Sequence, residues 1–247
     1  IVCLTHIFRQ ASQSDIVVNA HKINDGQHIV LDNKSRDFFL LKRYDADVII
    51  SVMLQLVKQK MPKYVDATPY DVQGLTPTRK GLLGVERLNG ILQQYLNPPG
   101  KGKKEHQVGE RIFREGDKVM QIRNNYDKDV FNGDVGRIVF LDGKERTLSV
   151  RYDDRVVPYD FEELDELTPA YAISIHKSQG SEYPAVVIPL MMQHYVLLQR
   201  NLVYTGVTRG KKLVVLVGES RALHMAVKNN KTRTRHTRLA LRLQPLT

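Results

Sequence analysis

The sequence predicts an α/β protein, a parallel β-sheet covered by helices with a small β-barrel inserted into one of its loops. Strand-like and helix-like segments alternate over residues 1–105 and again over residues 166–247, which is the pattern of a parallel sheet with crossover helices. Between them, residues 106–165 carry several short β-branched runs separated by turn residues, without helical periodicity. That pattern predicts an SH3-like or OB-like barrel.

Helical periodicity is clearest in two segments of the first part. Residues 13–24 place their apolar side chains on one face, and Gly26 is the expected stop. Residues 45–60 do the same, with a buried stripe that includes Val48. Pro62 is the expected end of that helix, because proline lacks the N–H that a helix interior needs.

The remaining elements follow from local composition. Residues 71–77 predict a short strand that breaks into a loop, and residues 84–95 predict the next helix. Residues 97–104, rich in Pro, Gly and Lys, predict a flexible connector. Residues 185–189 and 213–217 are uninterrupted apolar runs, typical of strands buried on both faces of a parallel sheet.

Length and composition exclude several classes of protein. The chain has 247 residues, 42% of them apolar and 26% charged, enough to bury a core without disulfides or metal. No apolar run approaches the roughly 18 residues of a membrane span. The single cysteine, Cys3, excludes a disulfide framework and indicates a reducing compartment, so we expect a cytoplasmic protein. Because Ile1 opens directly into an apolar stretch without an initiator Met, we expect a piece of a longer chain.

The net charge of +10 favours polyanionic partners, because binding of phosphates releases counterions from a nucleic acid. A basic surface that only keeps the protein in solution is the alternative. The charge is unevenly distributed: residues 153–166 are rich in acids, whereas residues 228–242 contain only basic charges. That basic run predicts either a disordered tail or a DNA contact.

Common catalytic constellations are missing from the sequence. The eight histidines are not clustered with other ligands, so no metal site is predicted. Residues 206–212 have one residue too few between their glycines for a P-loop, and Lys212 stands where Ser or Thr must bind magnesium. The chain therefore cannot hold and cleave a nucleoside triphosphate on its own.

Four segments combine residue types that suit nucleotide or nucleic-acid contacts. Phe8 and Arg9 can stack on a base and reach a phosphate, or can simply cap a helix and meet a carboxylate. Residues 76–81 offer a hydroxyl, two cations and backbone N–H groups to a phosphate, or form an ordinary basic loop. Residues 174–184 crowd polar side chains between two strands, and residues 204–212 place an arginine before the last buried strand.

The order of these segments resembles the second half of a superfamily 1 helicase. The strings "LTHIFRQA", "LTPTRKGLLGVERLN", "GDKVMQIRNNYDKDVFNGDVGRI", "AISIHKSQGSEYPAVVI" and "LVYTGVTRGKKLVVLVG" are similar to the RecD-like branch, which comprises the alpha subunit of exodeoxyribonuclease V and its stand-alone relatives. The resemblance covers residues 1–218. It implies a second RecA-like domain, residues 1–105 and 166–247, that carries an inserted SH3-like domain at residues 106–165.

The same resemblance implies roles in ATP binding. Arg9 and Arg209 match the two arginines that reach the γ-phosphate across a cleft, and Phe8 matches the aromatic residue that lies against adenine. Glu182 matches the carboxylate that accepts from the ribose, and Gly180 lets the backbone approach closely. ATP and Mg²⁺ would be held mainly by a first RecA-like domain, which these residues do not include.

Contacts to single-stranded DNA are implied for Thr78, Arg79, His176 and Lys177, and residues 124–126 resemble the family pattern without an assigned contact. The implied activity is that of an ATP-dependent 5′ to 3′ DNA helicase of recombination and repair, with other exodeoxyribonuclease subunits as further partners and no membrane. This chain alone is expected to be inactive.

Other functions remain open from the sequence. A conjugative relaxase can carry a helicase domain with the same motifs. A non-enzymatic nucleic-acid-binding module, built on the barrel and the basic tail, would not need Arg9 and Arg209. A degenerate, helicase-like scaffold is the third alternative.

Overall fold

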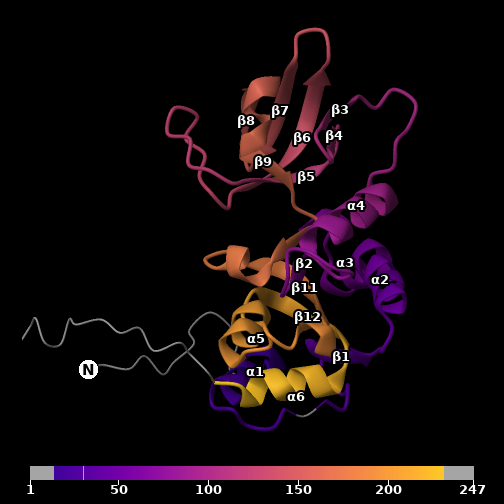
Figure 1. Cartoon of the computed structure of the whole chain (residues 1–247), viewed down its shortest axis with the longest axis vertical. Coiled ribbons are helices and arrows are strands. Elements are labelled where there is room, and N and C mark those ends of the chain that lie inside the picture. Colours follow the sequence, from indigo (N-terminus) through magenta and orange to yellow (C-terminus); the bar gives the residue numbers. More distant parts are fainter. Residues whose placement is uncertain (1–13, 30, 231–247) are drawn as a thin grey trace, which may run out of the picture.

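The computed structural model describes residues 14–29 and 31–230, and its strands form a parallel sheet and a separate set of antiparallel strands (Figure 1). Every pairing in the first sheet is parallel. The strands of this sheet, in spatial order, are β1 (Phe38–Lys42), β12 (Gly210–Gly218), β11 (Tyr183–Leu190), β2 (Val72–Thr76) and β10 (Ala172–Ser174). The predicted strands at 71–77, 185–189 and 213–217 are therefore confirmed as β2, β11 and β12.

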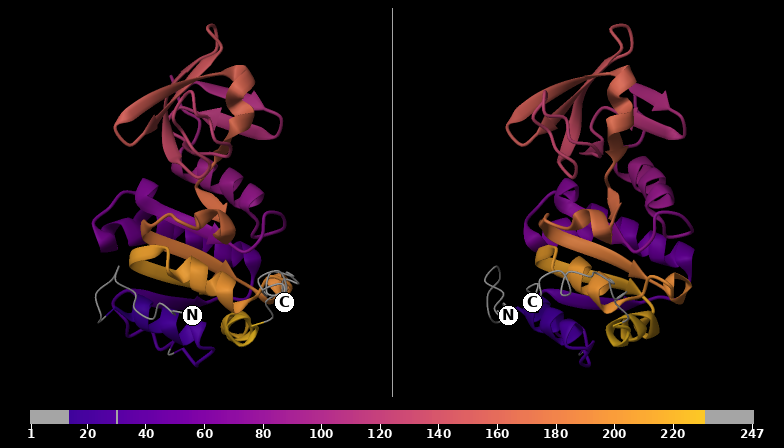
Figure 2. Two further views of the ribbon diagram at one scale, coloured as in Figure 1. Left: turned by 90° about the vertical axis from the view of Figure 1, so that its left-hand side faces the viewer. Right: turned by 60° about the vertical axis from the view of Figure 1, so that its left-hand side comes forward.

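Helices cover both faces of the parallel sheet (Figure 2). Side chains alternate along each strand, so Val186 and Ile188 of β11 pack with one set of helices and Ala185 and Val187 with the other. One face carries α1 (Asp15–Asn24), α5 (Arg200–Val207) and α6 (Ser220–Lys228); the other carries α2 (Ala46–Gln55), a π-helical turn (Leu56–Lys60), α3 (Met61–Val65) and α4 (Val85–Leu96). In the described part of the chain, no helix has the length and apolar character that a bilayer crossing needs.

The second predicted helix is corrected in two ways. Pro62 does not end it: the π-helical turn follows α2 and runs directly into α3, in whose first turn Pro62 lies. Val48 is 45% exposed, because the buried face of α2 is formed by Ala46, Ile49 and Met53 instead. The predicted helices at 13–24 and 84–95 are confirmed as α1 and α4.

Residues 105–169, here called the antiparallel unit, have a core of their own around Phe113, Ile138 and Tyr159. The short β-branched runs predicted within residues 106–165, at 117–122, 136–141, 147–152 and 155–158, are confirmed as β5 to β8. The strands are β3 (Glu105–Val108), β4 (Arg111–Arg114), β5 (Lys118–Gln121), β6 (Val135–Asp142), β7 (Thr147–Tyr152), β8 (Arg155–Asp160) and β9 (Leu167–Pro169).

The antiparallel strands do not close into a ring. Their order is β8-β7-β6-β5-β9, and among the described strands no pairing joins β8 to β9; β3 and β4 pair only with each other. β9 lies beyond the expected boundary at residue 165, yet pairs with β5. The division into two domains stays a prediction.

The exposed edge of the parallel sheet is covered by a side chain. Asn89 of α4 is buried and lies against β10, the last strand. Its amide nitrogen donates to the carbonyl of Ala172 at 2.8 Å, and its amide oxygen accepts from the N–H of Ala172 at 2.9 Å. The amide thus takes the place of a further strand and satisfies both backbone groups at this edge.

Replacing Asn89 with Ala is expected to lower the free energy of unfolding by about 2 kcal/mol, because the buried N–H and the buried carbonyl of Ala172 lose their hydrogen-bond partner. Urea unfolding would measure the change. The control is Gln94→Ala, an exposed position on the same helix, which should shift the unfolding midpoint little. Equal effects of the two substitutions would contradict the edge-covering role.

The junction between the two sheets contains a buried carboxylate. Asp117 accepts from the Tyr171 hydroxyl at 2.9 Å, from the Asn97 and Gln93 amides at 2.7 and 2.5 Å, and from the N–H of Arg114 at 2.7 Å. Burial raises the pKa of Asp117, and these hydrogen bonds oppose that rise. The carboxylate therefore joins the turn before β5 to α4, to the connector and to the residue before β10.

The next residue, Lys118, is a buried cation. Its exposed fraction is 2%, and Nζ donates to the carbonyl of Tyr70 at 2.7 Å, with the carbonyl of Val72 at 3.5 Å. The rings of Tyr70 and Tyr183 lie 5.1 and 5.8 Å from Nζ. Burial lowers the pKa of Lys118 to about 7, against the attraction of Asp71, which raises it.

This burial predicts a specific pH dependence. The ordinary pKa of a lysine is 10.5, so between pH 7 and 10.5 the unfolded chain holds a proton that the folded chain has released. Stability from this group therefore rises with pH in that window. Relative to Lys118→Met, the wild type should gain about 2 kcal/mol of unfolding free energy between pH 7 and pH 9. Urea titrations at both pH values measure this; a constant difference would contradict the burial of a titrating amine.

Candidate nucleotide and nucleic-acid site

Arg209 lies where β12 begins, and its guanidinium is held at three nitrogens. Nε donates to the carbonyl of Thr205 at 3.1 Å, Nη1 to the carbonyl of Ser181 at 2.9 Å and Nη2 to the hydroxyl of Thr208 at 3.0 Å. Thr205 is in the last turn of α5, where carbonyls lack helical partners and favour a cation. These bonds use three of the five donors of a guanidinium, in a fixed orientation.

Glu182 lies on the same edge, immediately before β11. The N–H of Tyr183 donates to the carbonyl of Arg209 at 2.9 Å, which joins the first residue of β11 to the residue before β12. Nζ of Lys211 lies 3.0 Å from the Glu182 carboxylate, which is 24% exposed. Gly180 has φ +88°, a left-handed conformation that favours glycine. Three predicted ATP-site residues, Gly180, Glu182 and Arg209, are therefore brought together.

The loop after β2 is built by its own hydrogen bonds. The N–H groups of Val85 and Glu86, at the start of α4, donate to the carbonyls of Thr78 and Arg79 at 3.1 and 3.2 Å. The Thr78 hydroxyl donates to the carbonyl of Lys80 at 3.0 Å. The N–H groups of Val85 and Glu86 are thus bonded within the loop, and phosphate binding by the N–H groups of residues 76–81 stays a prediction. The loop presents the side-chain cations of Arg79 and Lys80 to a possible phosphate ligand.

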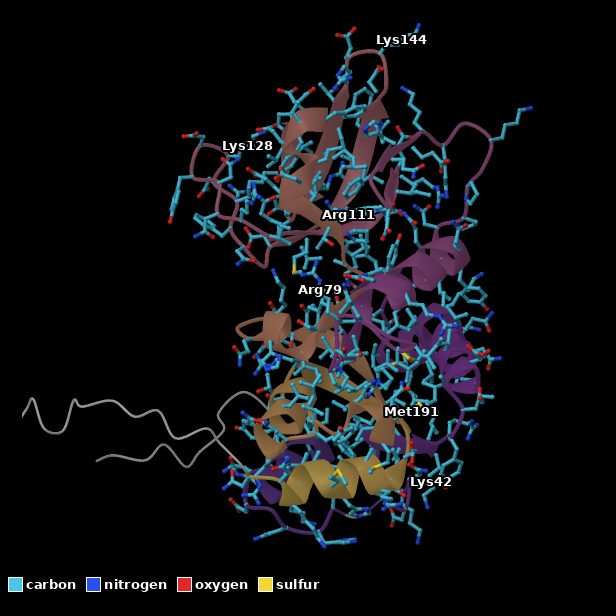
Figure 3. All side chains as sticks on the ribbon, in the orientation of Figure 1. Lys42, Arg79, Arg111, Lys128, Lys144 and Met191 are labelled. Atoms are coloured by element: carbon cyan, nitrogen blue, oxygen red, sulfur yellow. The ribbon has the colours of Figure 1, made fainter. Side chains whose placement is uncertain are left out.

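Arg79 lies in the region between the parallel sheet and the antiparallel unit (Figure 3). Its side chain is 83% exposed, and Nε is 3.3 Å from the Glu86 carboxylate. His176 and Lys177 lie on the 3-10 turn Ile175–Ser178 that follows β10. Buried Ile175 and Ser178 anchor this turn, so His176 and Lys177 are exposed to solvent.

The predicted residues fall into two groups, one at each end of the parallel strands. Thr78 and Arg79 follow β2, whereas Glu182 and Arg209 precede β11 and β12; because the strands are parallel, these positions are at opposite strand ends. Residues 175–182 run from the end of β10 back to the start of β11, so one short segment links the two edges.

Two predicted residues, Phe8 and Arg9, lie outside the described part of the chain, as does the basic run beyond residue 230. Sequence reasoning missed Asp117 and Lys118; its available signal was two adjacent charges beside the apolar run of β5. Lys211 was missed as well. Over residues 14–29 and 31–230, no three His, Cys, Asp or Glu side chains are grouped as metal ligands would be.

Comparisons with known proteins match this chain to helicases. Residues 88–152 match the family model of the ATP-dependent RecD-like DNA helicase SH3 domain, and residues 169–217 match that of the UvrD-like helicase C-terminal domain. The chain is 32% identical over 241 residues to the ATP-dependent RecD2 DNA helicase of Deinococcus radiodurans, which covers 98% of this chain and 32% of that protein. It is 32% identical over 157 residues to the RecBCD enzyme subunit RecD of Haemophilus influenzae, covering 64% of this chain and 23% of that subunit.

Solved helicases share the fold. The crystal structure of Bacteroides Pif1 bound to ssDNA aligns with a TM-score of 0.55 and 17% identity over 87% of this chain and 51% of that one. Pif1 helicase from Candida albicans aligns with a TM-score of 0.53 and 18% identity over 90% of this chain and 56% of that one. The chain thus spans about a third of its first curated relative and about half of these structures. Together, the findings confirm the predicted resemblance and the RecA-like fold: the chain resembles RecD-like helicases, and residues 169–217 match a helicase C-terminal domain.

Proposed function

We propose that this chain is the second motor domain of an ATP-dependent DNA helicase that translocates 5′ to 3′ in recombination and repair. The observation that carries the proposal is the fixed guanidinium of Arg209 beside Glu182, at one edge of a RecA-like sheet. The alignment with the Deinococcus helicase covers 98% of the chain, against 51% to 68% for RecD subunits, which favours a stand-alone helicase over a nuclease subunit.

In this proposal Arg209 stabilises the charge that develops on the γ-phosphate during hydrolysis. A cation that is already oriented needs no reorganisation when the reaction occurs, and this is where electrostatic catalysis gains most. The three hydrogen bonds of Arg209 supply that orientation. Arg9 acts as the second arginine and Phe8 stacks on adenine. A P-loop domain, which these 247 residues lack, supplies the main contacts to ATP and Mg²⁺.

Glu182 accepts from the ribose hydroxyls, and Gly180 lets the backbone come close to the nucleotide. Nζ of Lys211 lies 3.0 Å from this carboxylate, which keeps a charged acceptor at the start of β11.

Single-stranded DNA crosses the opposite edge, along Arg79, Lys177, Thr78 and His176. Nζ of Lys177 lies 3.3 Å from the amide oxygen of Asn132, so the 3-10 turn reaches the antiparallel unit at this point. Exposed cations on such a path bind phosphates without regard to sequence. The segment 175–182 carries DNA-side residues at one end and nucleotide-side residues at the other, and we infer that it transmits cleft closure to the DNA.

Replacing Arg209 with Lys in the full-length protein should lower DNA-stimulated kcat by about a thousandfold, since a lysine keeps the charge but loses the fork that holds it in place. The affinity for single-stranded DNA should change by less than about threefold, because Arg209 lies at the other strand ends. Steady-state ATP hydrolysis and fluorescence anisotropy measure the two quantities.

Arg221→Lys, an exposed arginine on α6, is the matched control. Thermal unfolding of both variants separates a folding defect from a catalytic one. Unchanged turnover in a folded Arg209→Lys protein would remove Arg209 from this role.

Replacing Arg79 or Lys177 with Ala should weaken binding of single-stranded DNA without sequence preference. For each DNA phosphate that a variant no longer binds, the slope of log Kd against log salt concentration should fall by about 0.7. Anisotropy titrations at several salt concentrations measure the slope. Lys144→Ala, at the far tip of the antiparallel unit, should leave it unchanged (Figure 3); the same slope in all variants would refute the path.

A further inference from the structure

Lys118 is an ionisable amine that is buried at a position where stability alone would favour an apolar side chain. Among the described residues, no carboxylate lies within ion-pair distance of Nζ, and its contacts are the Tyr70 and Val72 carbonyls and two tyrosine rings. A charge at Nζ, held by carbonyls, rings and the attraction of Asp71 from beyond ion-pair distance, loses its hydration without the full attraction of an ion pair. An apolar side chain of the same length would fill this space at lower cost. Stability therefore does not explain why a lysine stands at position 118.

The contacts of Lys118 fall at the starts of two neighbouring strands. Tyr70 precedes β2, Val72 is its first residue, and Tyr183 is the first residue of β11. Tyr183 follows Glu182 in the chain, and its N–H donates to the carbonyl of Arg209. A chain of contacts therefore connects β5 of the antiparallel unit to Arg209. Nζ of Lys118 lies over the Tyr183 ring, and the Tyr183 N–H donates to the carbonyl of Arg209.

Asp117 makes the matching contact on the other side of the junction. Its bond to the Tyr171 hydroxyl reaches the residue before β10, which is the third neighbouring strand start. Two adjacent charged residues thus fix the antiparallel unit to β2, β11 and β10 at once. The backbone of Lys118 adds to this, because its carbonyl accepts from the N–H of Ala170 at 2.9 Å.

We propose that Lys118 is a positioning residue through which the antiparallel unit controls the edge that carries Glu182 and Arg209. This proposal rests on the proposed function, in which Glu182 and Arg209 bind a nucleotide. DNA that binds between the parallel sheet and the antiparallel unit shifts the unit. The Lys118 amine then moves against the Tyr70 and Tyr183 rings, and the carbonyl of Arg209 moves with the Tyr183 N–H to which it is bonded. The nucleotide site thereby responds to bound DNA.

The test compares Lys118→Met and Lys118→Gln with the control Lys144→Met in the full-length protein. We expect ATP hydrolysis without DNA and the Kd for single-stranded DNA to stay within about twofold of the wild type. The stimulation of kcat by DNA should fall about tenfold in both Lys118 variants and not in the control. Stimulation equal to that of the wild type would overturn the proposal.

A second measurement tests the contact without enzyme activity. Amide hydrogen exchange of the present chain should show faster exchange at Tyr183 in Lys118→Met, with Val215, in the middle of β12, still protected. Loss of protection at both positions in Lys118→Gln as well would mean a general structural role and would overturn the proposal. If the wild type hydrolyses no ATP with DNA present, the proposed function fails, while the exchange at Tyr183 still decides whether Lys118 holds this edge.

Discussion

Burial of the parallel sheet on both faces constrains every other part of this structure. Helices must cover both sides, so the strands β11 and β12 are apolar over nearly their whole length. Polar side chains then have room only at the strand ends and at the outer edge. Arg209 and Glu182 lie at one set of ends, Arg79 at the other, and Asn89 at the edge. The positions available for chemistry thus follow from the core.

Elements with a strong periodic signal could be predicted from the sequence. α1 and α4 show one apolar helical face, β11 and β12 are continuous apolar runs, and β5 to β8 are separated by turn residues. β9 and β10 have three residues each and depend on their partners for pairing, so no local pattern marks them. The π-helical turn before Pro62 was not predicted either, because such turns are rare.

The candidate site was also predictable only in part: its local motifs could be found in the sequence, but the relative positions of these motifs could not. The segments with Thr78, His176 and Arg209 could be found because each crowds polar groups into a turn beside an apolar strand. That Arg79 and Arg209 lie at opposite strand ends depends on strand order and direction, which only the fold reveals. Asp117 and Lys118 could not be recognised, because adjacent charges in a short strand are usually on the surface, and their burial is created by a second sheet packed against them.

The position of β12 between β1 and β11 has a consequence for protein synthesis. Both neighbours of this strand are made before it, and β1, with the sequence FFLLK, is made some 170 residues earlier. At elongation rates of about 5–20 residues per second, β12 is completed about ten seconds or more after β1. The unpaired apolar edge of β1 is exposed for that time, so the nascent chain presents a binding segment to chaperones until the last strand emerges.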